Sequence, residues 1–184
     1  MLIGPAQTGK KTRLIRQFRA SAEAAREGGT SGRRTWLVPS AASVDPLREQ
    51  LIAHSSAAIL DPGVQTFANF ADSIVRLGSR RVRPISLLQK RFLLHRVLLQ
   101  AEEDNQLSYF APIIRTPGFL AQLDRWIADK KRNDVWAEDF KKHTQSQRDR
   151  ELGHLYGEYQ RLLAVGKLYD AEGRFWAARE ILNE

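Results

Sequence analysis

GPAQTGKK, residues 4–11, is the stretch from which the fold of this chain is best deduced. Gly4, Gly9 and Lys10 match G-x-x-x-x-G-K, the pattern of phosphate-binding loops, in which backbone N–H groups and the start of the next helix face phosphate oxygens. The hydroxyl residue that should follow the lysine and hold Mg²⁺ is replaced by Lys11, and Thr12 comes one position late. The sequence therefore predicts a phosphate cradle more strongly than a metal-dependent triphosphatase.

The predicted phosphate-binding residues form one continuous segment, and ATP is the nucleotide that the pattern implies. Sliding the pattern by one residue does not restore the Mg²⁺ ligand, because the required glycines would then fall on Pro5 and Lys10. Thr12 also lies about 100° further round the helix than the ligand position. The alternative is a glycine-bearing turn that binds no ligand. The segment comprises Gly4, Pro5, Ala6, Gln7, Thr8, Gly9, Lys10, Lys11 and Thr12.

Short β-prone runs alternate with helical stripes in the first part of the chain. The predicted strands cover residues 2–3, 35–38 and 64–67, and the predicted helices begin at Lys10, at Asp45-Pro46 with Asp45 as the cap, and near Phe70. Alternation of this kind predicts an α/β fold, here a P-loop-type partial parallel sheet with flanking helices over residues 1–84.

After Pro84 the apolar residues recur only at helical spacing, which predicts an all-helical subdomain over residues 85–184. Thr116-Pro117 and Asp170 are typical helix starts, and Gly166 is a typical helix stop. The four tryptophans suit the packing of these helices rather than a platform for stacked bases.

The composition indicates a soluble, cytoplasmic protein with a polyanionic partner. The 184 residues carry a net charge of +8 and contain no cysteine, so a disulfide framework and a thiolate metal site are both excluded. We find neither a signal peptide nor an apolar run near the ~20 residues that a membrane span requires.

Three segments stand in the order expected of a superfamily 1 helicase motor: GPAQTGKKT, WLVPSAASVDPLREQL and VQTFANFADSIV. The chain resembles most closely the AddB/RexB-like family, the helicase–nuclease proteins of bacterial double-strand break repair. The helical segments PGFLAQLDRWI and RDRELGHLYGEYQRLLAVGKLYDAEGRFWAA are also similar to that family. The resemblance covers nearly all of this chain but only the first part of a family member.

The resemblance implies single-stranded DNA and a helicase–nuclease partner subunit as binding partners. It assigns DNA contacts to Ser40, Ser43, Thr66 and Phe67, because hydroxyls bind backbone phosphates and an aromatic ring stacks on a base. Two alternatives remain: the serines cap the helix led by Pro46, and Phe67 packs in the core.

Full family members continue into an acidic strand motif and a nuclease domain with an iron–sulfur cluster, and this chain has neither. We therefore expect a fragment, a truncated gene product or a split protein, without helicase or nuclease activity of its own. No catalytic or metal-binding residue is predicted: Asp61 precedes Pro62-Gly63 and is read as a turn residue, and the four histidines lack metal-ligand spacing.

Two other functions are compatible with the sequence. The first is a non-catalytic protein-interaction domain in which the loop is a relic. The second is a small P-loop kinase, which would need a late arginine cluster; Arg148 and Arg150 are the nearest candidates and look like the start of a helix.

Overall fold

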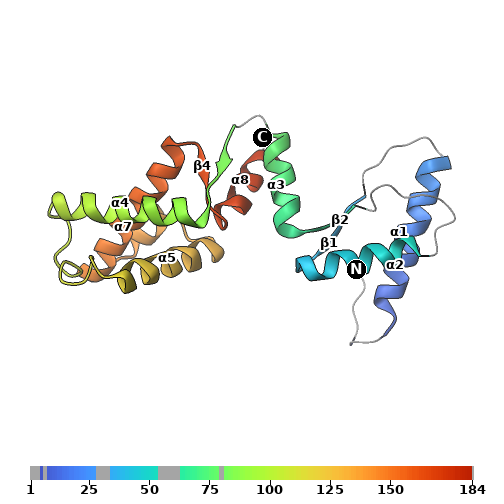
Figure 1. Cartoon of the computed structure of the whole chain (residues 1–184), viewed down its shortest axis with the longest axis horizontal. Coiled ribbons are helices and arrows are strands. Elements are labelled where there is room, and N and C mark those ends of the chain that lie inside the picture. Colours follow the sequence, from blue (N-terminus) through green and yellow to red (C-terminus); the bar gives the residue numbers. More distant parts are fainter. Residues whose placement is uncertain (1–4, 6–7, 28–33, 54–62, 79–80, 184) are drawn as a thin grey trace. The chain divides into compact units, whose positions relative to one another are not determined.

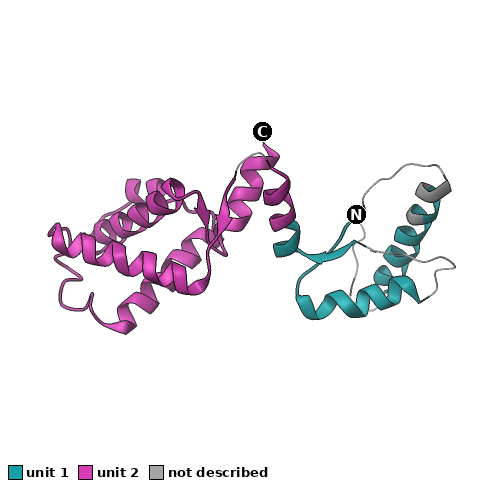
Figure 2. Cartoon of the chain, turned by 45° about the horizontal axis from the view of Figure 1, so that its top comes forward, with its two compact units in different colours: residues 1–70 teal, residues 71–184 magenta. Residues whose placement is uncertain are grey.

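The structure is a computed structural model that describes residues 5, 8–27, 34–53, 63–78 and 81–183 (Figure 1). It divides into two compact units, Met1–Phe70 and Ala71–Glu184 (Figure 2). The predicted domains 1–84 and 85–184 stay predictions. The boundary between the two compact units falls within helix α3 (Phe67–Leu77). The later part of this helix belongs to the second unit, because its residues Ala71 and Val75 are buried in a cluster with Tyr169 and Ala178.

Unit 1 is built on a small parallel sheet. Strands β1 (Trp36–Val38) and β2 (Val64–Thr66) pair in parallel, with Trp36 beside Val64 and Val38 beside Thr66. The described residues of the unit also form the helix α1 (Lys10–Glu27), the 3-10 turn η1 (Ala41–Ser43), the helix α2 (Val44–Ile52) and the first residues of α3. The α/β class is confirmed, whereas the predicted strand at residues 2–3 lies outside the described residues.

The core of unit 1 joins the sheet to its helices. Val38 and Val64 are buried with Leu47 and Leu51 of α2, and the half-buried side chains packed against them include Ile15 and Phe18 of α1. The helical stripe predicted after the phosphate loop therefore faces the sheet, as a flanking helix of an α/β unit does.

Two predicted boundaries in unit 1 are wrong. Helix α2 begins at Val44 with Ser43 as its N-cap residue, two residues before the predicted cap, and Asp45 lies in its first turn, where it forms an ion pair of 3.5 Å with Arg48. Phe67 is the first residue of α3 and not the end of a strand. The Thr66 hydroxyl accepts a hydrogen bond of 3.1 Å from the amide of Asn69, which turns the chain into a helix at that point.

In the described residues of unit 2, five further helices follow α3; the main core lies among α4 to α7, and α8 packs in the separate cluster with α3. Leu94, Leu123, Ile127, Leu155 and Tyr156 are fully or almost fully buried at the centre of the main core. Helix α4 lies against both α5 and α7 (Figure 1). The helices are α4 (Leu87–Glu103), α5 (Pro117–Arg132), α6 (Ala137–Lys142), α7 (Gln147–Val165) and α8 (Gly173–Leu182).

The prediction of an all-helical second part is wrong, because β4 (Leu168–Tyr169) pairs in parallel with β3 (Arg83–Pro84). The amide of Arg83 donates to the carbonyl of Lys167 over 2.9 Å, and the amide of Ile85 donates to the carbonyl of Tyr169 over 2.8 Å. This pairing joins the segment before α4 to the segment after α7.

One predicted helix start is confirmed by its cap. Thr116 caps α5, with Pro117 as the first helical residue, and its hydroxyl accepts a hydrogen bond of 3.3 Å from the amide of Phe119. The start predicted at Asp170 is too early, because helix α8 begins at Gly173 with Glu172 as its N-cap residue; Asp170 accepts a hydrogen bond of 2.8 Å from the Gly173 amide in the turn before the helix. Among the described helices, none combines the length and the apolar character needed to cross a bilayer.

Candidate functional site

Within the predicted phosphate-binding segment, Gly9 has a φ of 75°, in the left-handed region. Glycine adopts this conformation without the steric cost that a side chain would bring. A Cβ atom at Gly9 would meet no atom within 4 Å, so the space beside this residue is open. Helix α1 follows at once, and the amide of Arg13 donates to the Gly9 carbonyl over 3.0 Å.

The Lys10 ammonium lies over the described part of the loop. It donates to the carbonyl of Pro5 and, over 3.0 Å, to the hydroxyl of Thr8. The Thr8 hydroxyl donates in turn to the Pro5 carbonyl over 3.0 Å. The first turn of α1 contains no acidic residue, so nothing there neutralises the positive end of the helix dipole.

These residues fit a phosphate group better than they fit a metal ion. A lysine ammonium, an open glycine and a helix start all favour an anion. Lys11 and Thr12 are exposed, and a lysine ammonium offers a metal no lone pair. Within the described ranges no three His, Cys, Asp or Glu side chains are grouped so that they could hold a metal ion. Gly4, Ala6 and Gln7, like Asp61 and His54, lie outside the described residues.

The four predicted DNA-contacting residues lie at or just after the carboxyl ends of the two strands of unit 1. The parallel register places Val38 beside Thr66, so the turn that starts at Ser40 and the start of α3 at Phe67 leave the same edge of the sheet. In open parallel α/β sheets this edge is where ligands bind. The structure therefore brings together residues that are far apart in the sequence.

Ser40 and Phe67 at this edge are exposed, and Ser43 and Thr66 are half-buried. The hydroxyls of Ser40 and Ser43 lie 3.0 Å apart, and neither makes a capping hydrogen bond. Phe67 is 53% exposed. Ser43 occupies the N-cap position of α2 without a capping bond from its hydroxyl, and the exposure of Phe67 does not agree with a core position. Thr66 accepts the bond that caps α3, and its hydroxyl proton can still be donated.

The tryptophans pack as predicted. Trp136 and Trp176 stack on each other with ring centroids 4.0 Å apart, and Trp126 meets Phe140 and Tyr156 edge to face.

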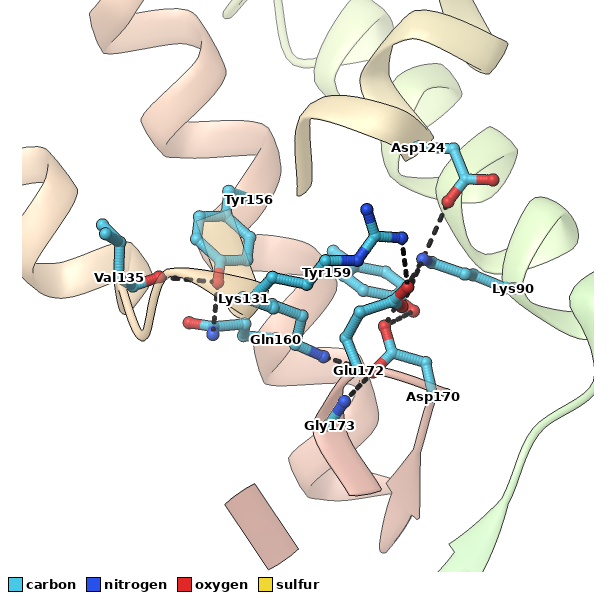
Figure 3. A network of polar contacts seen from close by, with 11 residues as sticks. Lys90, Asp124, Lys131, Val135, Tyr156, Tyr159, Gln160, Asp170, Glu172 and Gly173 are labelled. Carbon is cyan, nitrogen blue, oxygen red and sulfur yellow. Dashed lines mark hydrogen bonds and ion pairs between the residues drawn. The ribbon is translucent and has the colours of Figure 1, made fainter. Parts of the chain in front are cut away.

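Sequence reasoning missed a buried polar cluster in unit 2, drawn in Figure 3. Lys90, Lys131 and Asp170 are each at most 5% exposed. Lys131 binds Asp170 directly, and Lys90 binds Asp124 over 2.8 Å and Glu172 over 3.2 Å. The sequence of α4 contained a signal for this cluster. Lys90 shares a helix face with Leu94, Val97 and Ala101 and so occupies a core position, where a charged group needs buried partners.

The charges of this cluster compensate one another. Burial alone would raise the pKa of Asp170, but the ammonium groups of Lys131 and Lys90 and the Gly173 amide outweigh it and hold that pKa below its usual value. The cluster joins α4, α5, α7 and the start of α8, and its polar groups bind one another. It therefore stabilises unit 2 rather than offering a reactive group.

The fold and the polar edge together define a mixed α/β protein whose second unit is mainly helical. The chain matches the family model described as "ADDB, N-terminal" over residues 1–175, and it therefore belongs to that family. It corresponds to the N-terminal region of an AddB-type DNA repair helicase–nuclease subunit. This confirms the resemblance seen in the sequence. No curated protein matches the chain.

Proposed function

We propose that this chain is a helicase-like module of an AddB-type repair protein and that it contacts single-stranded DNA at the carboxyl edge of β1 and β2. The observation that carries the proposal is the parallel register of Val38 with Thr66, which gathers Ser40, Ser43 and Phe67 at one edge. The family assignment supports it independently, as does the net charge of +8, because cationic proteins attract phosphate backbones.

Each side chain at the edge has a distinct part in the proposed contact. The hydroxyls of Ser40, Ser43 and Thr66 donate hydrogen bonds to backbone phosphates, which position the strand without reading its sequence. The exposed ring of Phe67 stacks on one base. Binding of this kind tolerates any sequence, as a repair protein that moves along DNA requires.

A second part of the proposal concerns the loop 4–12. Its backbone and Lys10 hold the phosphates of ATP, and Lys11 offsets phosphate charge where a Mg²⁺ ion is otherwise held. The isolated chain does not hydrolyse ATP, because hydrolysis also needs a bound metal, a group that positions water and an arginine finger. A helicase–nuclease partner subunit and a cytoplasmic location belong to the same proposal.

Fluorescence anisotropy with a labelled oligothymidine tests the DNA contact. Loss of one stacked base costs about 1–3 kcal/mol, so Phe67→Ala is expected to weaken binding by roughly fivefold or more. Phe175→Ala is the matched control, because that ring is 49% exposed on α8. Equal affinities for the two variants would remove Phe67 from the DNA site and contradict the proposed edge.

The nucleotide part is tested separately with a fluorescent ATP analogue and a phosphate-release assay. We expect binding without Mg²⁺ that Lys10→Ala weakens, and no hydrolysis by the isolated chain. DNA-stimulated hydrolysis that Lys10→Ala abolishes would show an active motor and overturn this part.

A further inference from the structure

Helix α4 has two apolar faces, of which only one is used by the core of unit 2. Leu94, Val97, Leu98 and Ala101 are buried against the neighbouring helices. On the opposite side, Leu88 and Phe92 are each 65% exposed and Leu99 is 41% exposed. The feature is unexpected in a core helix, whose outer face is normally polar.

The exposed apolar residues form a seam along the helix, with His95 between Phe92 and Leu99. Leu88, Phe92, His95 and Leu99 follow one another at spacings of four, three and four residues, which places them on one line along a helix. A shallow hollow of about 510 Å³ runs along this face and is lined by Phe92, His95 and Leu99, among others. A seam with this period is the form in which one amphipathic helix receives another.

Two arginines flank the seam, one on each side. At about 100° per residue, Arg91 and Arg96 project on either side of Phe92. Neither makes an ion pair with any residue that the structure describes, and both are exposed. At the end of the helix the charge reverses: Glu102 pairs with Arg115 over 3.0 Å, and Glu103 is exposed.

We propose that the seam Leu88–Phe92–Leu99 is the docking site for an acidic amphipathic helix of a partner protein. The apolar stripe of that helix covers the seam, and its carboxylates pair with Arg91 and Arg96. Such pairs fix the register of the partner and speed its association more than they add affinity. The apolar contacts at Phe92 supply most of the binding energy, as buried aromatic anchors do.

The charges disfavour the two other occupants. A second copy of the chain would bring two proteins of net charge +8 together, with the arginines of one seam near those of the other. Nucleic acid would meet the carboxylates of Glu102 and Glu103, and of the three seam residues Leu88, Phe92 and Leu99 only Phe92 presents a ring to a base. The inference does not rest on the proposed DNA contact, which concerns unit 1 and the residues of the β1–β2 edge.

The probe for this proposal is a fluorescein-labelled helical peptide of about 18 residues, long enough to form a helix and to span the seam. It carries leucines along one stripe and glutamates beside them. A sister peptide has the same leucines and a lysine in place of every glutamate. Binding to the full chain is measured by anisotropy, and the fold of each variant is checked by circular dichroism.

We expect the acidic peptide to bind at least about tenfold more tightly than the basic peptide, and Phe92→Ala to weaken it by about tenfold or more. Leu87→Ala is the matched control: Leu87 is 60% exposed on the same helix but lies to the side of the seam. The double variant Arg91→Gln, Arg96→Gln is expected to bring the two peptides to similar affinities.

Several results would overturn the proposal. One is equal binding of the acidic peptide by the Phe92→Ala and Leu87→Ala variants, and another is failure of both peptides to bind. Displacement of the peptide by oligothymidine would assign the seam to nucleic acid instead. Dimerisation of the chain that Phe92→Ala abolishes would assign it to a second copy.

Discussion

Tyr159 donates a hydrogen bond of 2.9 Å to Oδ2 of Asp170, although both residues are at most 1% exposed. The other oxygen of this carboxylate binds Lys131 and the amide of Gly173. One buried anion therefore connects α5, α7 and the start of α8. The stability of the mainly helical unit depends on this connection.

The Tyr159→Phe variant should be less stable than the wild type by about 1–2 kcal/mol, because it leaves a buried carboxylate oxygen with one partner fewer. Urea unfolding followed by circular dichroism measures this difference. Tyr109→Phe is the control, since Tyr109 is 55% exposed. If Tyr109→Phe lowered the unfolding free energy as much as Tyr159→Phe, the hydrogen bond from Tyr159 to Asp170 would not have the stabilising role assigned to it.

Removal of the Lys131 ammonium, which binds Asp170, should lower the free energy of unfolding by more than Tyr159→Phe does. Lys131→Met leaves Asp170 buried with a poorly compensated charge, and a loss of about 3–5 kcal/mol is expected. Adding Asp170→Asn to that variant should restore part of the lost stability, because the uncompensated charge is then gone. The double-mutant cycle gives the coupling between the two residues. Strictly additive effects would show that the pair does not act as a unit.

A methyl group at Gly173 has no room beside the same carboxylate. A Cβ atom there would lie 2.7 Å from Oδ1 of Asp170 and 3.1 Å from Nζ of Lys131. We expect Gly173→Ala to destabilise the protein by about 1–3 kcal/mol, the usual cost of overpacking. Gly118→Ala is the control, because a Cβ at Gly118 meets nothing within 4 Å and alanine favours the helix. Its melting temperature should be unchanged or higher.

Glu151 gives the protein a specific dependence on acid. The residue is 2% exposed. Burial raises the pKa of its carboxyl group, but hydrogen bonds from the amides of Tyr109, Ser108 and Phe110 and from Gln147 outweigh burial and lower that pKa to about 2. The folded-state pKa is below the unfolded value, so the stabilisation is complete above about pH 4.5 and is lost as the pH falls toward 2.

The Glu151→Gln variant should lack this dependence. Its stability at pH 7 should be lower by roughly 3 kcal/mol, which corresponds to a shift of between two and three pKa units. Between pH 5 and pH 3 its unfolding free energy should fall less steeply than that of the wild type. Glu158→Gln serves as the control, because the Glu158 carboxylate is exposed in its pair with Arg161. Parallel pH profiles for Glu151→Gln and the wild type would rule out the assigned pKa.

The sequence predicted the elements whose signals are local. Thr116-Pro117 identifies the start of α5 because both the cap and the proline act within one turn. The β3–β4 pair could not be predicted in the same way. Each strand has two residues, and the partners Arg83 and Leu168 are brought together by the packing of the helices between them.

The candidate site was predictable only in part. The loop pattern and the resemblance named the residues, but the edge that unites Ser40 with Phe67 depends on the register of two strands far apart in the sequence. The exposure of Phe67 was also not deducible, because a phenylalanine after a strand suits both a core and a binding surface. Lys90 was the missed signal, as a charge at a core position of α4 requires buried partners.

The pairing of β3 with β4 has a consequence for synthesis on the ribosome. Arg83 has no strand partner until Leu168 has been made, and Lys131 has no bond to Asp170, which follows it by 39 residues. Until residues 168–170 emerge, the buried lysines lack a main counter-charge and the sheet lacks a strand. The helices α4, α5 and α7 can form earlier, but the packing of unit 2 is completed only after these residues have been translated.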